Sequence, residues 1–239
     1  MNNPLQELDS IHASQVTKEK TLDSIFHKKR YPKALLCLPL IACLLLFFIF
    51  SVEPSTAPVA YVSLDINPSM ELHLNQENIV VETVAYNQEA QKILDQVSIQ
   101  GKKLQSAIQQ LLNDTQYENY LSDGILEVTV FSDNQKLSQK IESTLNLLFE
   151  KHLDTNQYHC SQITQETHHN AATHHISAGK YQIIEAIISY TSQYSLEELN
   201  QLSIQELYTI LYNFNQELVP DRCQPNHNQD NHHQNHKHS

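Results

Sequence analysis

Asn67 and Pro68 form a dipeptide whose peptide bond can break by intramolecular attack. In most Asn-X pairs the following backbone nitrogen attacks the side-chain amide, but proline has no backbone N–H and closes that route. The side-chain nitrogen of Asn67 can instead attack its own backbone carbonyl, which forms a cyclic imide and expels the Pro68 nitrogen. Attack by water on the same carbonyl gives the same two fragments. A turn that twists this amide out of plane would lower the barrier.

The expelled nitrogen must gain a proton, and three titratable residues stand near it in the sequence: Asp65, Glu71 and His73. Adjacent carboxylates repel each other, so a pairing of Asp65 with Glu71 would raise the pKa of one of them and make a general acid available. His73 is a second candidate acid. The alternative is that Asn-Pro-Ser simply makes a good turn, since these residue types favour turns.

Alternating apolar residues predict two strands on either side of the Asn-Pro bond. They form two rows with a spacing of two residues, namely Ala60, Val62, Leu64 and Ile66 before the bond and Met70, Leu72 and Leu74 after it. A two-residue loop over residues 68–69 would pair Ile66 with Glu71 and mix the two faces of the hairpin. A three-residue loop over residues 67–69 pairs Ile66 with Met70 and keeps the apolar side chains on one face.

The three-residue loop also decides what lies on the opposite face of the hairpin. In that register Asp65 lies beside Glu71, and Ser63 lies beside His73. The sequence therefore predicts a hairpin with the Asn67–Pro68 bond at its exposed tip and two carboxylates just below it.

Several stretches of the chain resemble one known family. They are residues 61–69 (YVSLDINPS), Glu71-Leu72, residues 81–87, residues 128–134 (VTVFSDN) and residues 178–181 (AGKY). Together they are similar to the extracytoplasmic domain of RsgI-type anti-sigma-I factors of Gram-positive bacteria, over most of residues 58–215. The resemblance implies a membrane-spanning inhibitor of an alternative sigma factor. It also implies that the Asn–Pro bond cleaves itself once, so that the chain is not an enzyme in the ordinary sense.

An uncharged apolar run over residues 34–52 is long enough to cross a bilayer once. Basic residues crowd its N-terminal flank and Glu53 follows it, which predicts a cytoplasmic N-terminus and an extracytoplasmic C-terminal domain in the cell membrane. A signal peptide cleaved near residues 55–57 is the alternative. The long segment before the run favours an anchor. Pro39 weakens the span locally, which suits an intramembrane protease as a partner.

The apolar run divides the charge of the chain. The formal net charge is −12, and residues 1–33 carry six Lys/Arg against four Asp/Glu, while residues 53–239 carry nine against twenty-three. The acidic outer part argues against nucleic-acid binding. Because the chain has only three glycines, it lacks Gly-rich phosphate loops, and no cofactor is expected.

The basic N-terminal segment carries apolar residues at helical spacing, including Leu22 and Ile25. They predict a helix that docks into a groove on a partner, and the resemblance makes that partner a sigma-I-like factor. A marginal helix that lies on the membrane is the alternative. The best-known members of the family carry a larger, strand-rich cytoplasmic domain, from which this short segment departs.

Strands alternate with amphipathic helices beyond the run, which predicts an α/β fold: a single transmembrane helix, a small mixed α/β extracytoplasmic domain and a helical C-terminal segment. Ser195 with Glu198 and Ser203 with Glu206 match the capping-box pattern within that segment. The expected divisions are a sigma-binding segment (1–33), the transmembrane helix (34–52), a linker (53–57), the α/β autocleaving domain (58–153), a His-rich polar loop (154–178), the helical segment (179–215) and a His-rich disordered tail (216–239).

The His-rich segments leave a second function open. Clustered His and Cys side chains can bind zinc or copper, although neither stretch has the ligand spacing of a structural site. The alternative function is therefore a membrane-anchored binding or metal-sensing protein without proteolysis. Cys160 and Cys223 could form a disulfide if that side of the membrane is oxidising.

Overall fold

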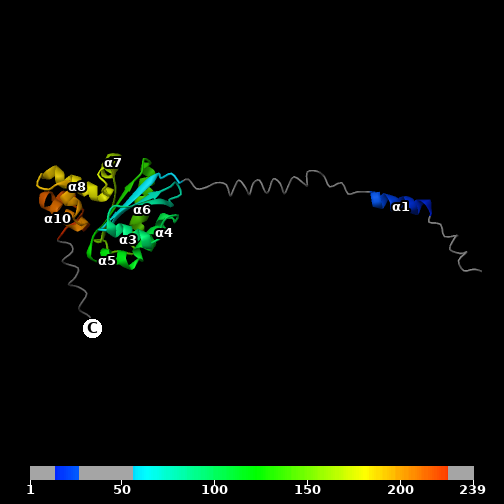
Figure 1. Cartoon of the computed structure of the whole chain (residues 1–239), viewed down its shortest axis with the longest axis horizontal. Helices are drawn as coiled ribbons and strands as arrows, with labels where there is room; N and C mark the ends of the chain where they lie inside the picture. Colours follow the sequence, from blue (N-terminus) through cyan, green and yellow to red (C-terminus); the bar gives the residue numbers. More distant parts are fainter. Residues whose placement is uncertain (1–13, 27–55, 226–239) are drawn as a thin grey trace, which may run out of the picture. The chain divides into compact units, whose positions relative to one another are not determined.

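The computed structural model describes residues 14–26 and 56–225 (Figure 1). The chain divides into two compact units, residues 1–53 and 54–239. In the first unit the described element is helix α1 (Gln15–Phe26), on which Leu22 and Ile25 are 53% and 68% exposed. The predicted membrane span over residues 34–52 lies outside the described residues. Among the residues that are described, no helix is both long enough and apolar enough to cross a bilayer.

The second unit is built on a five-stranded sheet with the order β3-β2-β1-β4-β5. The strands are β1 (Ala60–Asp65), β2 (Ser69–Leu74), β3 (Val80–Ala85), β4 (Leu126–Phe131) and β5 (Tyr158–Gln162). β1 pairs antiparallel with both β2 and β4, β3 pairs antiparallel with β2, and β5 pairs parallel with β4. β1, the first strand in the sequence, is therefore the middle strand of the sheet. The prediction of a mixed α/β domain is confirmed.

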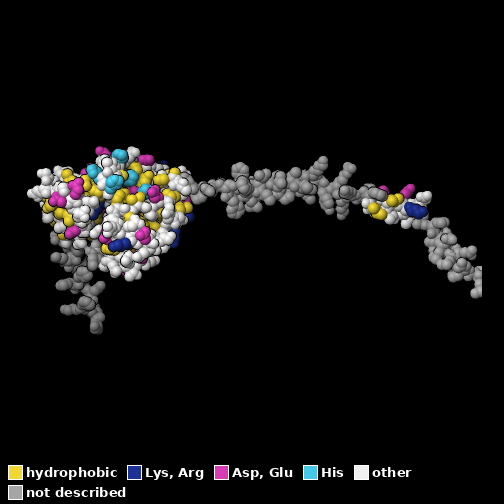
Figure 2. All heavy atoms as spheres, in the orientation of Figure 1, with side chains coloured by type: hydrophobic (Ala, Val, Ile, Leu, Met, Phe, Trp, Pro, Cys, Tyr) yellow, Lys and Arg dark blue, Asp and Glu magenta, His cyan; other side chains and the backbone are white. Residues whose placement is uncertain are grey.

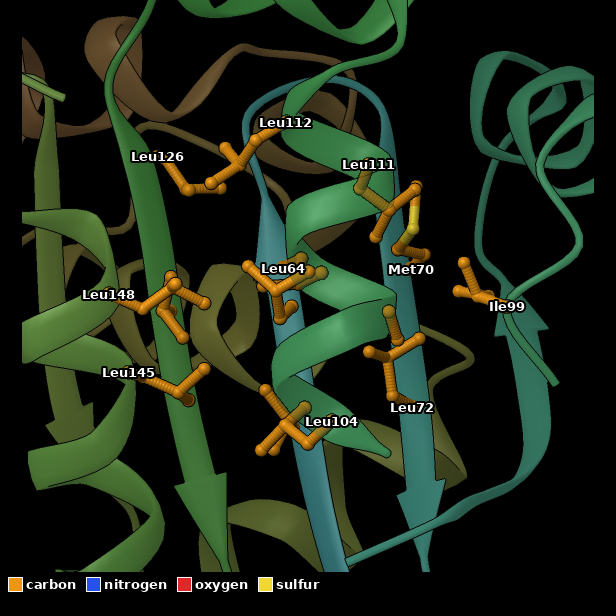
Figure 3. Packing of buried hydrophobic residues seen from close by; sticks show 14 of the residues in the cluster. Leu64, Met70, Leu72, Ile99, Leu104, Leu111, Leu112, Leu126, Leu145 and Leu148 are labelled. Carbon is orange, nitrogen blue, oxygen red and sulfur yellow. The ribbon is translucent and has the colours of Figure 1, made fainter. Parts of the chain in front are cut away.

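One face of the sheet is apolar and carries the main core. Leu64 of β1 and Leu72 of β2 are almost completely buried there, because alternate side chains of a strand point to the same side. Four helices contribute to this core: α3 (Gln88–Gln96), α4 (Leu104–Leu112), α5 (Thr115–Asp123) and α6 (Gln135–Phe149). Figure 3 shows α4 lying along β1 and β2, with Leu104 and Leu111 among the strand side chains, and Leu145 of α6 at β4.

The opposite face of the sheet is polar, yet it is equally buried. Asp65, Glu71 and Glu127 are each no more than 3% exposed. Helices α7 (Gln165–Thr173) and α8 (Ala178–Tyr190) contact this face, and α9 (Leu196–Asn200) and α10 (Ile204–Phe214) pack against α8. The short 3-10 helices η2 (Gln216–Leu218) and η3 (Asp221–Cys223) follow. Burying carboxyl groups is costly unless they are paired, so this face is the natural place to look for a functional site.

The C-terminal part of the second unit contains two helix caps and two cysteines for which the sequence made predictions. Ser195 and Ser203 form complete capping boxes at the starts of α9 and α10, as predicted. Cys160 and Cys223 are both free thiols, so the disulfide is not formed. Cys160 packs against the main core, whereas Cys223 belongs to a second apolar cluster around α8 and α10.

The segment over residues 154–178 is not a loop as expected, because it contains β5 and α7. Tyr158 of β5 is fully buried, with its ring centroid 5.3 Å from that of Phe149. The strand escaped prediction because three of its five residues, His159, Ser161 and Gln162, are polar. His159, for example, bonds to Glu127 rather than packing on apolar residues. The expected tail lies partly outside the described residues, and its first part contains η2 and η3.

The turn of the hairpin begins one residue earlier than predicted. Residues 66–68 connect β1 with β2, and the register pairs Leu64 with Met70 and Asp65 with Ser69. The observed register differs from the predicted one by two residues, so each apolar row keeps its face and the apolar pattern cannot distinguish the two registers. A tertiary contact distinguishes them. Ile66 leaves the strand and packs against Gly124, where a Cβ atom would lie 2.9 Å from Ile66 Cγ1.

Candidate functional site

Asn67 occupies the centre of the tight turn between β1 and β2. Its φ is +87°, a left-handed conformation that asparagine tolerates better than most residues. The Ile66 backbone N–H donates to the Pro68 carbonyl oxygen at 3.0 Å and closes the turn. The bond between Asn67 and Pro68 therefore lies in a defined backbone geometry at the tip of the hairpin, with Asn67 exposed and Pro68 buried.

A second asparagine holds the Asn67 side chain. Asn87 donates a hydrogen bond from Nδ2 to Asn67 Oδ1 at 2.9 Å. The Asn87 Oδ1 atom accepts from the Ala90 N–H at 2.9 Å as the N-cap of α3, and from the Ser69 N–H at 3.3 Å. The bond from Asn87 therefore engages the side-chain oxygen of Asn67 and not its nitrogen, the atom expected to act as the nucleophile.

Asp65 lies at the end of β1, and its carboxyl group is fully buried. Among the described residues, neither of its oxygens has a hydrogen-bond partner of good geometry, and the hydroxyls of Ser69 and Ser177 are also unpartnered. Burial raises the pKa of Asp65 to about 7, although the two nearby hydroxyls and Lys180 lower it, and Glu127 raises it further. Asp65 can therefore hold a proton near neutral pH and give it up.

The N-terminus of α8 lies directly on this carboxyl group. A Cβ atom at Gly179 would lie 2.8 Å from Asp65 Oδ2, so only glycine fits this approach. Lys180 follows, 5% exposed, and its Nζ donates to the Asn200 backbone oxygen at 2.6 Å. The N-terminus of a helix carries partial positive charge, which favours an anion at this position.

A polar cavity of about 270 Å³ opens beside the turn. It brings together the hairpin tip, the start of α3 and the start of α8. Its lining residues are Asn67, Ser69, Tyr86, Asn87, Glu89, Ser177, Lys180, Asn200 and Gln201. A polar cavity of this size has room for water, which both of the expected routes of bond cleavage would use.

Glu71 and His73 lie in a separate cluster, and the predicted pairing of Asp65 with Glu71 is wrong. Glu71 lies opposite Ser63, whose hydroxyl donates to it at 3.1 Å. The Nε2 atom of His73 lies 2.8 Å from Glu71 Oε1, and that of His168 lies 3.6 Å from Oε2. Burial alone would raise the pKa of Glu71, but its bonds to the two histidines hold it at about 2. Neither Glu71 nor His73 lines the cavity at the turn.

The carboxyl group that faces Asp65 belongs to Glu127 of β4. Glu127 is 1% exposed, and its Oε2 atom accepts from the Tyr208 hydroxyl at 2.7 Å and contacts His159 Nδ1 at 2.9 Å. The sequence reasoning missed Glu127 because the pairing of β1 with β4 joins strands far apart in the chain. It also missed Lys180, for which the AGKY stretch over residues 178–181 was the available signal.

Three of the described histidines in the second unit, His73, His159 and His168, contact carboxylates. Figure 2 shows His side chains gathered on one part of its surface, close to acidic side chains. His159 contacts Glu127, and His168 contacts Glu71. Within residues 14–26 and 56–225, no three His, Cys, Asp or Glu side chains are grouped in a way that could hold a metal ion.

Comparison with known proteins assigns the family. The sequence model of the anti-sigma factor RsgI-like central domain matches residues 59–186, which is more than half of the chain. The chain belongs to this family. The match begins at the start of β1 and ends within α8, so it includes the turn, Asp65 and Lys180, whereas α9 and α10 lie beyond it.

Three curated relatives are similar to this member of the RsgI-like family. Anti-sigma-I factor RsgI9 of Acetivibrio thermocellus is 26% identical over 178 residues, covering 70% of this chain and 25% of that protein. Anti-sigma-I factor RsgI of Bacillus anthracis is 31% identical over 150 residues, covering 59% and 33%. The Bacillus subtilis RsgI is 27% identical over 143 residues, covering 58% and 38%. The chain thus spans between a quarter and two fifths of the length of these relatives.

Proposed function

We propose that this chain is a membrane-anchored anti-sigma factor whose outer domain cuts its own backbone between Asn67 and Pro68. The observation that carries the proposal is the left-handed turn at Asn67 beside the unpartnered, buried carboxyl group of Asp65. Membership of the RsgI-like family and the anti-sigma-I names of the relatives support a sigma factor as the partner.

The cleavage proceeds by attack on the Asn67 carbonyl carbon. The Nδ2 atom of Asn67 forms a bond to that carbon and closes a cyclic imide, and the bond to the Pro68 nitrogen breaks. The leaving nitrogen takes a proton from Asp65, while Nδ2 gives up one proton to water in the cavity. Proton donation by a positioned acid contributes about 10²–10⁴-fold to such a step. Water attack on the same carbon leaves a carboxyl group on Asn67 instead of an imide, and it needs the same proton transfer to Pro68.

The two fragments stay together because the cut leaves the sheet intact. Residues 1–67 keep β1, whereas residues 68–239 supply the neighbouring strands β2 and β4, which pair with β1 on both sides. Val62 and Leu64 of β1 are also buried in the main core. Each such side chain contributes about 1.5–3 kcal/mol when it is buried, before the cost of ordering the strand. Dissociation requires a strand to leave the middle of a sheet and is therefore slow.

Signalling follows from removal of the outer fragment. In the proposed topology residues 1–33 hold the sigma factor in the cytoplasm, and the exposed Leu22 and Ile25 of α1 supply apolar side chains for that contact. Loss of residues 68–239 leaves a short stub outside the span over residues 34–52. An intramembrane protease then cuts the span and frees the sigma factor.

A denaturing gel of the full-length chain tests the cleavage. Two fragments are expected, with mass spectrometry assigning the junction to Asn67 and Pro68. Asn67→Gly is the matched variant, because glycine adopts a φ of +87° without strain but supplies no side-chain nitrogen. It should run as one band. An intact wild-type chain would contradict the proposal, and normal cleavage of Asn67→Gly would rule out the imide route.

Binding to the sigma factor is tested by co-purification. The full chain should retain a sigma factor from membranes solubilised in detergent, and a Leu22→Asp/Ile25→Asp double variant should not. Both side chains are exposed in α1, so these substitutions leave the fold of the second unit unchanged. Equal recovery of the sigma factor with both proteins would argue against α1 as the contact.

A further inference from the structure

Lys180 is the one positively charged residue among the described residues that line the cavity beside Asn67. It is only 5% exposed, and its Nζ donates a hydrogen bond to a neutral group, the Asn200 carbonyl oxygen. A buried ammonium group is stable only when an anion is close enough to compensate for its lost hydration. Burial lowers the pKa of Lys180, and the acidic side chains of Asp65 and Glu206 oppose that effect.

Two acidic side chains, Asp65 and Glu206, interact electrostatically with Lys180, and they differ in availability. Glu206 of α10 is exposed and accepts the Ser203 N–H at 2.7 Å within its capping box, so it is already engaged. Asp65 is fully buried, lies against Gly179 and has no hydrogen-bond partner of good geometry among the described residues. Asp65 is thus the group whose ionisation Lys180 can control.

We propose that Lys180 is a positioning residue for self-cleavage, whose ammonium group stabilises the carboxylate that forms when Asp65 gives its proton to the Pro68 nitrogen. The inference rests on the proposed cleavage and deepens it. Proton transfer converts a neutral buried acid into a buried anion, which is unfavourable without a nearby positive charge. Lys180 stabilises the ionised form of Asp65, which exists after proton transfer, more than the neutral form that exists before it. Such a difference in stabilisation accelerates the proton-transfer step.

The other groups around Asp65 do not replace Lys180. Glu127 of β4 carries a carboxyl group and opposes ionisation of Asp65. Ser69 and Ser177 offer neutral hydroxyls, and Tyr86 and Tyr117 offer phenols. Glu89 of α3 lines the cavity with a further acidic group. The N-terminus of α8 adds partial positive charge at Asp65, and within this set of described residues Lys180 supplies the full positive charge.

The test compares pH profiles of cleavage in the full-length chain. The protein is prepared in detergent at about pH 9, where the ionised Asp65 cannot donate a proton, and is then transferred to lower pH and sampled on denaturing gels. Lys180→Met removes the charge with little change of shape, and Lys180→Gln also keeps a hydrogen-bond donor for the Asn200 carbonyl. Lys140→Met, an exposed lysine of α6, is the matched control.

In the wild-type chain the cleavage rate should fall as the pH rises through the pKa of Asp65. Both Lys180 variants should cleave more slowly, and the midpoint of their profiles should lie about one pH unit higher or more, because a neighbouring positive charge typically lowers a carboxyl pKa by 1–3 units. Lys140→Met should match the wild type. A slower Lys180 variant with an unchanged midpoint would mean a structural role only and would overturn the inference.

A second measurement does not depend on cleavage. The carboxyl carbon of Asp65 is titrated by ¹³C NMR in the Asn67→Gly chain with and without Lys180→Gln. The midpoint should rise when the lysine is replaced, and an equal midpoint would overturn the inference. If the wild-type chain stays intact at every pH, the proposed function fails, while this titration still decides whether Lys180 controls the ionisation of Asp65.

Discussion

Asp65 and Glu127 face each other across β1 and β4, both buried, and only Glu127 has hydrogen-bond partners among the described residues. This asymmetry makes Asp65 our candidate for the acid in the proposed cleavage. Asp65→Asn keeps the shape of the side chain but cannot donate a carboxyl proton, so cleavage should slow by about 10²–10⁴-fold. Denaturing gels of pulse-labelled protein measure the rate. Cleavage at the wild-type rate would exclude Asp65 as the acid.

The same substitution should stabilise the folded domain. The pKa of Asp65 rises from 3.8 in the unfolded chain to about 7 in the folded one. Between these values the folded state holds a proton that the unfolded state has lost, so stability falls as the pH rises and the loss is complete above about pH 7. In the Asn67→Gly background, Asp65→Asn should raise the free energy of unfolding by a few kcal/mol at about pH 8.

Denaturant unfolding followed by fluorescence measures this difference. At about pH 3, where Asp65 is protonated in both states, the two proteins should unfold at nearly the same denaturant concentration. An equal stability at about pH 8 would show that the carboxyl group costs nothing, contrary to its burial without partners.

Asn87→Asp separates the two contacts of the residue that holds Asn67. Aspartate keeps the acceptor oxygen that caps α3, so stability should change by less than about 0.5 kcal/mol. It lacks the Nδ2 donor to Asn67, so the Asn67 side chain loses its fixed orientation and cleavage should slow by about tenfold. Gels give the rate and thermal unfolding gives the stability. Asn87→Ala additionally removes the cap, and an unchanged rate in Asn87→Asp would make the Asn87–Asn67 bond irrelevant to cleavage.

Leu64→Ala tests whether β1 holds the nicked fragments together. Leu64 is 1% exposed, and its truncation should cost about 2–5 kcal/mol of packing between β1 and the core. The variant should still be cleaved, but residues 68–239 should appear in the medium without a stimulus, and a sigma-dependent reporter should rise. Leu147→Ala, on the exposed side of α6, is the control, since Leu147 is 61% exposed. A nicked Leu64→Ala protein that stays with the membrane would contradict the role of β1.

Tyr208→Phe tests the helical cover beyond the family match. The change removes the hydroxyl that donates to Glu127 at 2.7 Å and leaves a buried acceptor short of a partner, which costs about 1–3 kcal/mol. Hydrogen exchange should become faster in α8 and α10, and the melting temperature should fall. The exposed Tyr194 offers Tyr194→Phe as a control without effect. Unchanged exchange in Tyr208→Phe would mean that α10 is held by its apolar contacts alone.

The hairpin, its two faces and the place of Asn67 at the tip were predictable because an alternating pattern and a turn are local properties of the chain. The exact register was not. A shift of two residues keeps every apolar side chain on its face, and the contact of Ile66 with Gly124 that decides between the registers joins residues almost sixty positions apart. The wrong register placed Glu71 beside Asp65. In the structure, the residues opposite Asp65 are Ser69 of β2 and Glu127 of β4.

The parts of the site that the sequence did not reveal come from distant strands and helices. Glu127 lies opposite Asp65 only because β4 pairs with β1, and Gly179, the residue before Lys180, lies against Asp65 only because α8 begins over the polar face of the sheet. Buried polar surfaces also hide secondary structure. His159 in β5 and His168 in α7 bond to carboxylates, so a strand and a helix have the composition of a solvated loop.

If the chain is cut at the proposed bond, the middle position of β1 gives the domain a definite mechanical response. A pull along the strand loads the hydrogen bonds on both of its edges at the same moment, whereas a pull across an edge strand would open them one after another. The register of β1 also cannot shift gradually, because a shift of one residue would place Leu64 in the polar layer and Asp65 in the apolar core. It holds its place under a weak load and leaves all at once under a strong one, so the domain converts a graded force into a single, irreversible event.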